Sequence, residues 1–257
     1  MTRFVLLCLL SGCHCSTNHA FQAPTDTVLL PIPDRQWAEG APDEGWCGET
    51  SIQMAALHYG AWVPQSVINS LGRSNHVDLW EEDIPTALDK LGLEYERAQV
   101  SSRDDFVSWI IGQVRRGNPV IVGAKLMPSD HPEWDVDHLM PIVGFSPRGL
   151  MFNTNLGRGQ EEIPYAALGG HEGISFVSPT GKFYGFAVLG FRDAGPRVTL
   201  EVVDESADSL ELEVKAEPGV SGELQRDDLA GGLTAGPMVT RLTIPRATSA
   251  RFKLVSK

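Results

Sequence analysis

The spacing of hydrophobic residues changes along the chain from a helical period to a strand period. In the first half, Ile52, Ala55, Ala56 and Tyr59 recur on one face of a helix predicted over 48–59, and Gly60 ends it. Similar patterns, opened by Pro or acidic residues and closed by Gly, predict three further helices. They span 64–72, 81–92 and 102–117. The first half of the chain is therefore predicted to be mainly helical.

Short apolar runs of strand length follow this helical half, and Gly, Pro and Arg residues separate them. They lie at 119–126, 138–145, 149–155 and 183–191. Helices followed by a set of strands joined through short turns are typical of an α+β domain with an antiparallel sheet. We therefore predict an α+β domain over residues 30–193, with helices in its N-terminal half and an antiparallel sheet in its C-terminal half.

Beyond residue 196 the pattern is strict alternation of apolar and polar positions. It occurs at 197–204, 209–217, 238–245 and 250–256, with Gly-, Asp- and Ser-rich turns between the stretches and no helical period. Alternation of this kind indicates strands that bury one face only. We predict a small β-sandwich-like domain over residues 196–257.

The N-terminus has the features of a targeting segment. A positive "MTR" precedes the apolar "FVLLCLL", which is too short to span a bilayer, and "LSGC" follows it. The last four residues resemble the bacterial lipoprotein cleavage box, and the resemblance implies that Cys13 carries lipid. An ordinary signal peptide cut near Ala20 is the alternative. Residues 1–20 are thus predicted to be a signal segment and tether, and the protein to be exported, either lipid-anchored to the cell envelope or periplasmic or extracellular.

Composition supports a folded domain and excludes one class of partner. The chain has 257 residues, of which 42% are hydrophobic, and its formal net charge is -12. A general nucleic-acid binder needs a basic surface for the phosphates, so we expect no nucleic-acid partner.

Cys47 is the one cysteine in the predicted folded body, since Cys8, Cys13 and Cys15 fall in or beside the N-terminal segment. It is either a small buried core residue or a nucleophile. Its position at the start of a helix is expected to lower the pKa of the thiol, because unpaired backbone N–H groups and the helix dipole favour the thiolate. Gly48, which follows it, would let a substrate approach the backbone closely.

Two later features follow Cys47 in chain order. His138 opens the predicted strand over 138–145, although the chain has seven histidines and a strand-end histidine often has no chemical role. The turn "SPRG" returns the chain antiparallel, which brings Asn153 or Asn155 back beside His138. A side-chain amide there would fix the tautomer of the imidazole, although "NTN" could equally be a plain turn.

The stretches "CGETSIQMAALHYG", "HLMPIVGF" and "NTNLG" together resemble papain-like cysteine peptidases, in the branch of the double-glycine leader peptidases and their free-standing relatives. The resemblance covers roughly residues 34–192 and implies a papain-like core. It implies that Cys47 is the nucleophile and His138 the general base and then the acid. Asn153 matches the acidic or amide position of the family's Asp-Pro-x-x-Gly pattern, and Asn155 is the alternative on the same strand face.

The family's oxyanion donor is where this chain departs from the pattern. Members usually carry a glutamine about six residues before the cysteine, and this chain has Ala41 there. The candidate substitutes are Gln36, which lies further upstream, and the backbone around Gly48, with Trp46 as a candidate substrate contact. Loss of one oxyanion donor costs roughly 3–4 kcal/mol of transition-state stabilisation.

These features give three hypotheses for function. The first is a peptidase or amide hydrolase that acts on peptides or proteins without a cofactor. The second is a peptide-binding module of the same fold, and the third is a thiol acyltransferase or deamidase, since transfer and hydrolysis share the thioester intermediate. The segment "SDHPEWDVDH" is rich in acids, but its spacing matches no metal loop, so we assign no metal site there. If it flanks His138, it would favour basic peptides and raise the pKa of the histidine.

Overall fold

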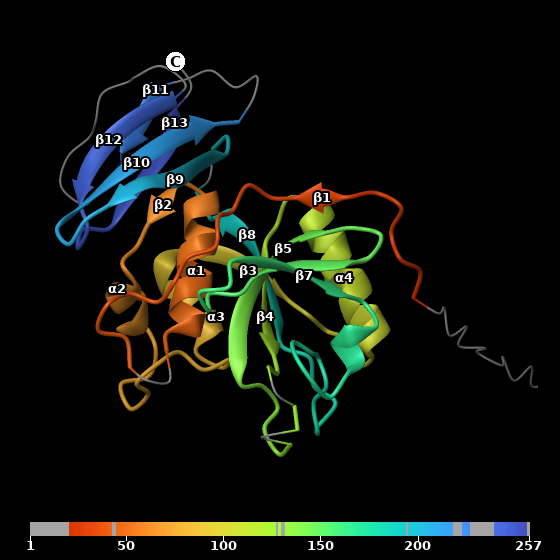
Figure 1. The fold of residues 1–257 in the computed structure, drawn as a ribbon. Helices are drawn as coiled ribbons and strands as arrows, with labels where there is room; N and C mark the ends of the chain where they lie inside the picture. The colour runs from red at the N-terminus through yellow and green to blue at the C-terminus, as the bar shows by residue number, and fades with distance from the viewer. Residues whose placement is uncertain are drawn as a thin grey trace, which may run out of the picture.

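The computed structural model describes residues 21–42, 45–126, 128–129, 132–193, 195–217, 223–226 and 239–255. Its centre is a seven-stranded sheet, whose path runs β3-β8-β4-β5-β6-β7 with β1 paired beside β5 (Figure 1). All of its strand pairs are antiparallel. The predicted α+β class is confirmed. The strands are β1 (Val28–Leu29), β3 (Leu93–Arg97), β4 (Val120–Ala124), β5 (His138–Phe145), β6 (Gly149–Asn153), β7 (Gln160–Pro164) and β8 (Gly185–Phe191).

Helices cover both faces of this sheet. On β4, Val120 and Val122 pack in the cluster that includes helix α4, whereas Ile121 packs in the cluster that includes helices α1 and α3. This follows from the two-residue period of a strand, which sends neighbouring side chains to opposite faces. The sheet is therefore buried on both sides, and its central strands β4, β5 and β8 are apolar except for His138 at the start of β5. The helices are α1 (Cys47–His58), α2 (Gln65–Asn69), α3 (Ile84–Leu91) and α4 (Arg103–Arg115).

Helix α1 is buried along its whole length, and this position determines the candidate site. All twelve of its residues are buried, including the polar side chains of Glu49 and Gln53. The helix begins at Cys47, so its N-terminus lies inside the molecule, where strand β5 packs against it. A buried helix start needs partners for its free N–H groups, which makes this end chemically distinctive.

The C-terminal residues form two three-stranded sheets that share one apolar core. One sheet has the order β12-β10-β9 and the other the order β11-β13-β2. Leu212 of the first sheet and Phe252 of the second pack in a cluster with Trp62 of β2, a strand that follows α1 in the chain. The C-terminal sheets are thus joined to the main domain through β2. The strands are β2 (Ala61–Trp62), β9 (Val198–Glu205), β10 (Ser209–Ala216), β11 (Glu223–Arg226), β12 (Val239–Pro245) and β13 (Ala250–Val255).

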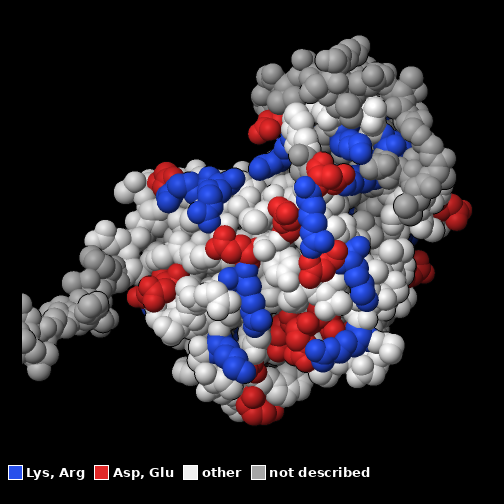
Figure 2. Space-filling model, turned by 180° about the vertical axis from the view of Figure 1, so that it is seen from behind, with Lys and Arg blue, Asp and Glu red and all other residues white. Residues whose placement is uncertain are grey.

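Several predictions concern residues or properties outside this core. Residues 1–20, with Cys13 and its proposed cleavage site, lie outside the described residues. Among the residues that the structure describes, no helix is both long and apolar enough to cross a bilayer. On the face shown in Figure 2, Lys and Arg side chains alternate with Asp and Glu side chains, and no continuous basic surface is visible.

Candidate active site

Three segments that are far apart in the sequence meet at the N-terminus of α1. The Cys47 Sγ accepts a hydrogen bond from the Leu139 N–H at 3.4 Å, directly after His138 at the start of β5. The Asn155 Nδ2 donates to the Leu139 carbonyl oxygen at 3.1 Å and lies 3.5 Å from the Cys47 carbonyl oxygen. The fold therefore gathers the cysteine, the segment of the histidine and one asparagine around one helix end.

The Cys47 thiol is almost fully buried, with 7% of the residue's surface exposed. Burial raises the pKa of this thiol to about 12, and the negative charges of Glu49 and Asp78 add to the rise. The N–H groups of Leu139 and Gly48 favour the thiolate, as the sequence predicted, but they are outweighed. The predicted lowering of the pKa of Cys47 is therefore wrong.

The His138 ring is also buried, and its Nε2 lies 3.1 Å from the Thr154 carbonyl oxygen. A carbonyl oxygen only accepts, so Nε2 carries the proton and Nδ1 is the unprotonated nitrogen in the neutral ring. Burial lowers the pKa of His138, although the Thr154 carbonyl, Asp137 and Asn155 each act to raise it. Asp137 of the acidic segment thus acts in the expected direction, but desolvation of the imidazolium is the larger effect and the pKa is lowered overall.

The structure brings Asn155, and not Asn153, to the histidine. The side chain of Asn155 supports the protonated form of His138. The side chain of Asn153 is also buried, but it donates to the Ile32 carbonyl oxygen at 2.8 Å and accepts from Gln160 at 3.1 Å. Asn153 thus anchors the N-terminal segment, and Asn155, the alternative, is the asparagine that lies beside His138.

Trp37 is a site residue that the sequence analysis missed. Its indole Nε1 donates to the Asn155 Oδ1 at 3.2 Å, and its ring packs against Gly45, where a Cβ atom would lie only 2.4 Å from the ring. The Asn155 N–H donates to Asp34 at 2.9 Å. We call residues 34–38 the N-terminal arm, which thus supports Asn155 from outside. The sequence feature that could have identified Trp37 is its position as the one aromatic residue in "DRQWAEG".

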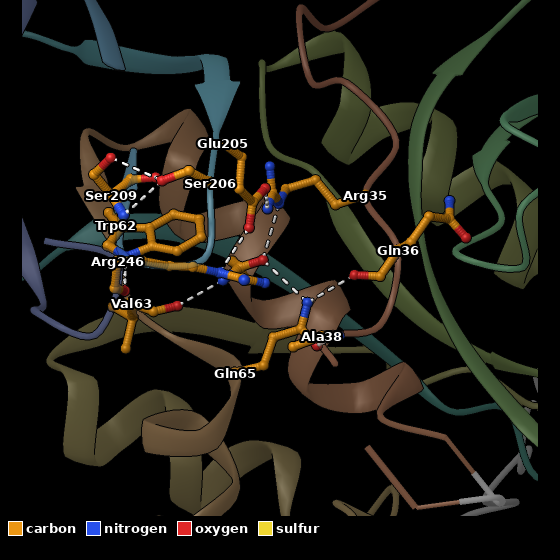
Figure 3. A network of polar contacts seen from close by, with 11 residues as sticks. Arg35, Gln36, Ala38, Trp62, Val63, Gln65, Glu205, Ser206, Ser209 and Arg246 are labelled. Atoms are coloured by element: carbon orange, nitrogen blue, oxygen red, sulfur yellow. Dashed lines mark hydrogen bonds and ion pairs between the residues drawn. The ribbon is translucent and has the colours of Figure 1, made fainter. Parts of the chain in front are cut away.

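The proposed oxyanion glutamine lies elsewhere. Gln36 is exposed, its Oε1 accepts from the Gly157 N–H, and its Nε2 donates to Asp34. In Figure 3 its side chain points away from Gln65, while its carbonyl oxygen accepts from the Gln65 Nε2 at 2.9 Å. Ala41 closes a turn by donating to the Ala38 carbonyl oxygen at 3.1 Å. Gln36 therefore fastens the arm to the loop after β6.

The other two predicted contacts at the helix start face the chain itself. A Cβ atom at Gly48 would lie 2.9 Å from the Leu79 carbonyl oxygen and 3.2 Å from Leu139. The space beside the Gly48 backbone, which we expected a substrate to occupy, is therefore filled by Leu79 and Leu139. The Trp46 indole donates to the Val77 carbonyl oxygen at 3.2 Å. Residues 77–79 therefore form a wall beside the helix start.

The acidic segment before His138 is used structurally. Asp135 accepts from Ser178 and Thr180, and Asp137 accepts from the Leu126 N–H. Asp130 and His131 of the same segment lie outside the described residues, and the described ones hold no cluster of His, Cys, Asp and Glu suited to a metal ion.

Comparisons with protein-family models, curated proteins and solved structures find no significant match to this chain. The chemistry of the site is therefore argued from its geometry.

Proposed function

We propose that the protein is a cysteine-dependent hydrolase of peptide or amide bonds with a papain-like core. The observation that carries the proposal is the meeting of Cys47, the His138 strand and Asn155 at one buried helix start. These residues come from positions up to 108 apart in the chain. A nucleophile, a base and a group that orients the base are the parts that thiol catalysis requires.

In the proposed mechanism, His138 takes the proton of the Cys47 thiol through Nδ1, since the Thr154 carbonyl holds the proton on Nε2. The thiolate attacks the substrate carbonyl, and the imidazolium then protonates the leaving amine. Water, deprotonated by the neutral His138, hydrolyses the thioester and returns the thiol. Because burial keeps the pKa of Cys47 at about 12, the proton moves when substrate binds rather than in a preformed ion pair.

The test combines thiol labelling with a digest of a peptide library. We expect the intact protein to cleave a subset of peptides, the Cys47→Ala variant to cleave none, and His138→Ala to slow both cleavage and alkylation of Cys47. Asn118→Ala removes a half-buried amide just before β4, at the end of that strand away from the residue that pairs with His138, and serves as the control for folding. Alkylation of Cys47 only after unfolding, together with the absence of peptide cleavage, would refute the proposal that the protein is a hydrolase.

A peptide-binding module is the second candidate, and one observation favours it. Gln36 is engaged by Gly157 and Asp34, so the side-chain donor expected for the oxyanion is bonded elsewhere. Peptide binding that is unchanged in Cys47→Ala, with no product from the intact chain, would favour this candidate. Added amines that become linked to the product would instead identify acyl transfer.

A further inference from the structure

A cleft of about 580 Å³ runs beside helix α1, between the main domain and the C-terminal sheets. The N-terminal arm, α1 and α2 form one side of it, and Glu205 and Arg246 of the C-terminal sheets form the other. Trp37, Trp46 and Trp62 contribute to its walls. Its volume lies within the range usual for ligand sites in proteins, roughly 300–1,000 Å³.

This cleft begins next to the candidate active site. Trp46 directly precedes Cys47, and Trp37 is hydrogen-bonded to Asn155. Gln53, which lines the cleft, comes six residues after Cys47 on α1 and so lies about 9 Å further along the helix axis. An extended peptide advances roughly 3.3 Å per residue. Because six residues also turn the helix by about 240°, a peptide from Cys47 would pass around α1 as well as along it, and would need at least three residues to reach Gln53.

Two arginines and one glutamate meet at the far end of the cleft. Glu205 accepts from Arg35 at 2.7 Å and pairs with Arg246 at 2.9 Å, as Figure 3 shows. The Arg35 Nε donates to Gln53 at 3.0 Å, and its guanidinium lies 5.1 Å from the centre of the Trp62 ring. Two positive charges against one negative charge leave this end with an excess of one positive charge.

The guanidinium groups retain donors for a ligand. Each guanidinium has five N–H groups in a planar fork, a geometry that matches a carboxylate. Their polar contacts with the residues that the structure describes use Nε and Nη2 of Arg35 and only Nε of Arg246. The Arg246 side chain is 28% exposed. Two further acids line the cleft, Asp34, which already accepts from the Asn155 N–H, and Glu39, so the excess of positive charge is confined to the Arg35–Glu205–Arg246 group.

We propose that this cleft binds the part of a peptide that extends from Cys47, and that Arg246 and Arg35 hold a carboxylate of that peptide. This inference rests on the proposed function, because it takes the Cys47 site as the reacting end. The carboxylate belongs either to an acidic side chain or to the C-terminus of the peptide. The C-terminal sheets then take part in substrate selection, through residues some 200 positions away from the nucleophile in the chain.

The experiment measures peptide binding to the full chain carrying Cys47→Ala, so that the peptides stay intact. The first series of probes is nonapeptides of Ala, Ser and Gly, acetylated at the N-terminus and amidated at the C-terminus, with one Glu placed at each position in turn. The second series has Gln in place of Glu. The third series is the Gln peptides with a free C-terminal carboxylate. Tryptophan fluorescence reports occupancy, since three tryptophans line the cleft. We expect binding on the order of tenfold tighter for a carboxylate at one position, because hydrogen bonds to charged groups are the stronger ones. The Glu series and the free-terminus series separate the two sources.

Two substitutions in the same network have opposite expected effects. Arg246→Gln removes a donor and should abolish the preference for the carboxylate. Glu205→Gln removes the competing acceptor and should increase that preference by a further severalfold. Arg241→Gln, which changes an exposed arginine of β12, should leave it unchanged. Equal affinity for Glu and Gln peptides, or an equal loss in Arg246→Gln and Glu205→Gln, would overturn the inference.

Cleavage by the unaltered chain separates this inference from the proposed function. Cleavage without any carboxylate preference overturns the role of the arginines and leaves the hydrolase standing. Carboxylate-dependent binding without cleavage supports the role of the cleft and favours the peptide-binding module over the hydrolase.

Discussion

Glu49 is a buried acid two residues after the candidate nucleophile, and the structure predicts that it makes the stability of the fold depend on pH. Its Oε1 accepts from Asn69 at 2.8 Å and from the Leu79 N–H at 2.9 Å. Its Oε2 is buried and has no hydrogen-bond partner among the described residues. A carboxylate in this position loses hydration that the protein replaces only in part.

The size of the effect follows from the pKa. Burial raises the pKa of Glu49 from its ordinary 4.5 to about 7. A raised pKa in the folded state means that stability is fully present below pH 4.5 and is lost as the pH rises through 7. A rise of the pKa from 4.5 to about 7 corresponds to a loss of about 3 kcal/mol of stability across that window.

The perturbation is Glu49→Gln, which keeps the shape of the side chain and removes its titration. Its amide N–H groups at the Oε2 position would be unpaired, a cost of about 1–3 kcal/mol that does not vary with pH. The unaltered chain should therefore be the more stable of the two at pH 4. Its advantage should then shrink by about 3 kcal/mol by pH 8, because only its side chain becomes charged.

Urea denaturation followed by tryptophan fluorescence at pH 4 to 8, under reducing conditions, measures this difference. Glu94→Gln, on exposed β3, is the matched control and should differ from the unaltered chain by an amount that does not change with pH. A stability difference for Glu49→Gln that stays constant within about 1 kcal/mol over the whole range would refute the reasoning. Because the charge of Glu49 also raises the pKa of Cys47, Glu49→Gln should alkylate faster than the unaltered chain at pH 8.

Three further substitutions test the site. Asn155→Gly keeps the left-handed backbone at φ 48° but removes the amide, so peptide cleavage by the folded fraction should fall at least tenfold, and the loss of a buried partner for Leu139 and Trp37 should cost about 1–3 kcal/mol of stability. Asn153→Ala removes a buried donor to a backbone carbonyl and should cost about 1–3 kcal/mol of stability by urea denaturation, with similar specific activity in the folded fraction. Gly48→Ala gains about 1 kcal/mol of helix propensity but places a Cβ 2.9 Å from the Leu79 carbonyl oxygen. Because the steric cost is the larger, the variant should be less stable by about 1–2 kcal/mol in urea denaturation. A variant more stable than the unaltered chain would contradict this.

The central elements could be predicted because their hydrophobic period is strong. The helix predicted over 48–59 is α1 (Cys47–His58), and the strand predicted over 138–145 is β5 with the same limits. Strands β3 and β7 were not predicted, since "LEYER" and "QEEIP" carry charges at several positions. Both lie at the ends of the sheet path, where one side has no neighbouring strand and charged side chains remain in contact with water.

The ionisation of the site could not be predicted from position alone. A helix start favours a thiolate within its first turn, and the sequence does place Cys47 there. Whether that effect is the larger one depends on how deeply the thiol is buried, and Cys47 packs in one buried cluster with Leu79 and Leu139, which are distant in the chain. At His138 burial likewise outweighs the groups that favour the charged form, so the pKa of the thiol is raised and that of the imidazole is lowered.

The choice between Asn153 and Asn155 shows where sequence spacing stops being informative. Two residues apart on a strand, they would share a face, and the spacing to Gly157 favoured the first. The strand ends at Asn153, however, and Asn155 adopts a left-handed backbone conformation, so the two side chains diverge. Asp34 and Trp37 hold Asn155 in this conformation from about 120 positions upstream. The N-terminal arm therefore determines which of the two asparagines lies beside His138, and under the proposed mechanism changes in the arm should affect the chemistry of Cys47 as strongly as changes in Asn155 itself.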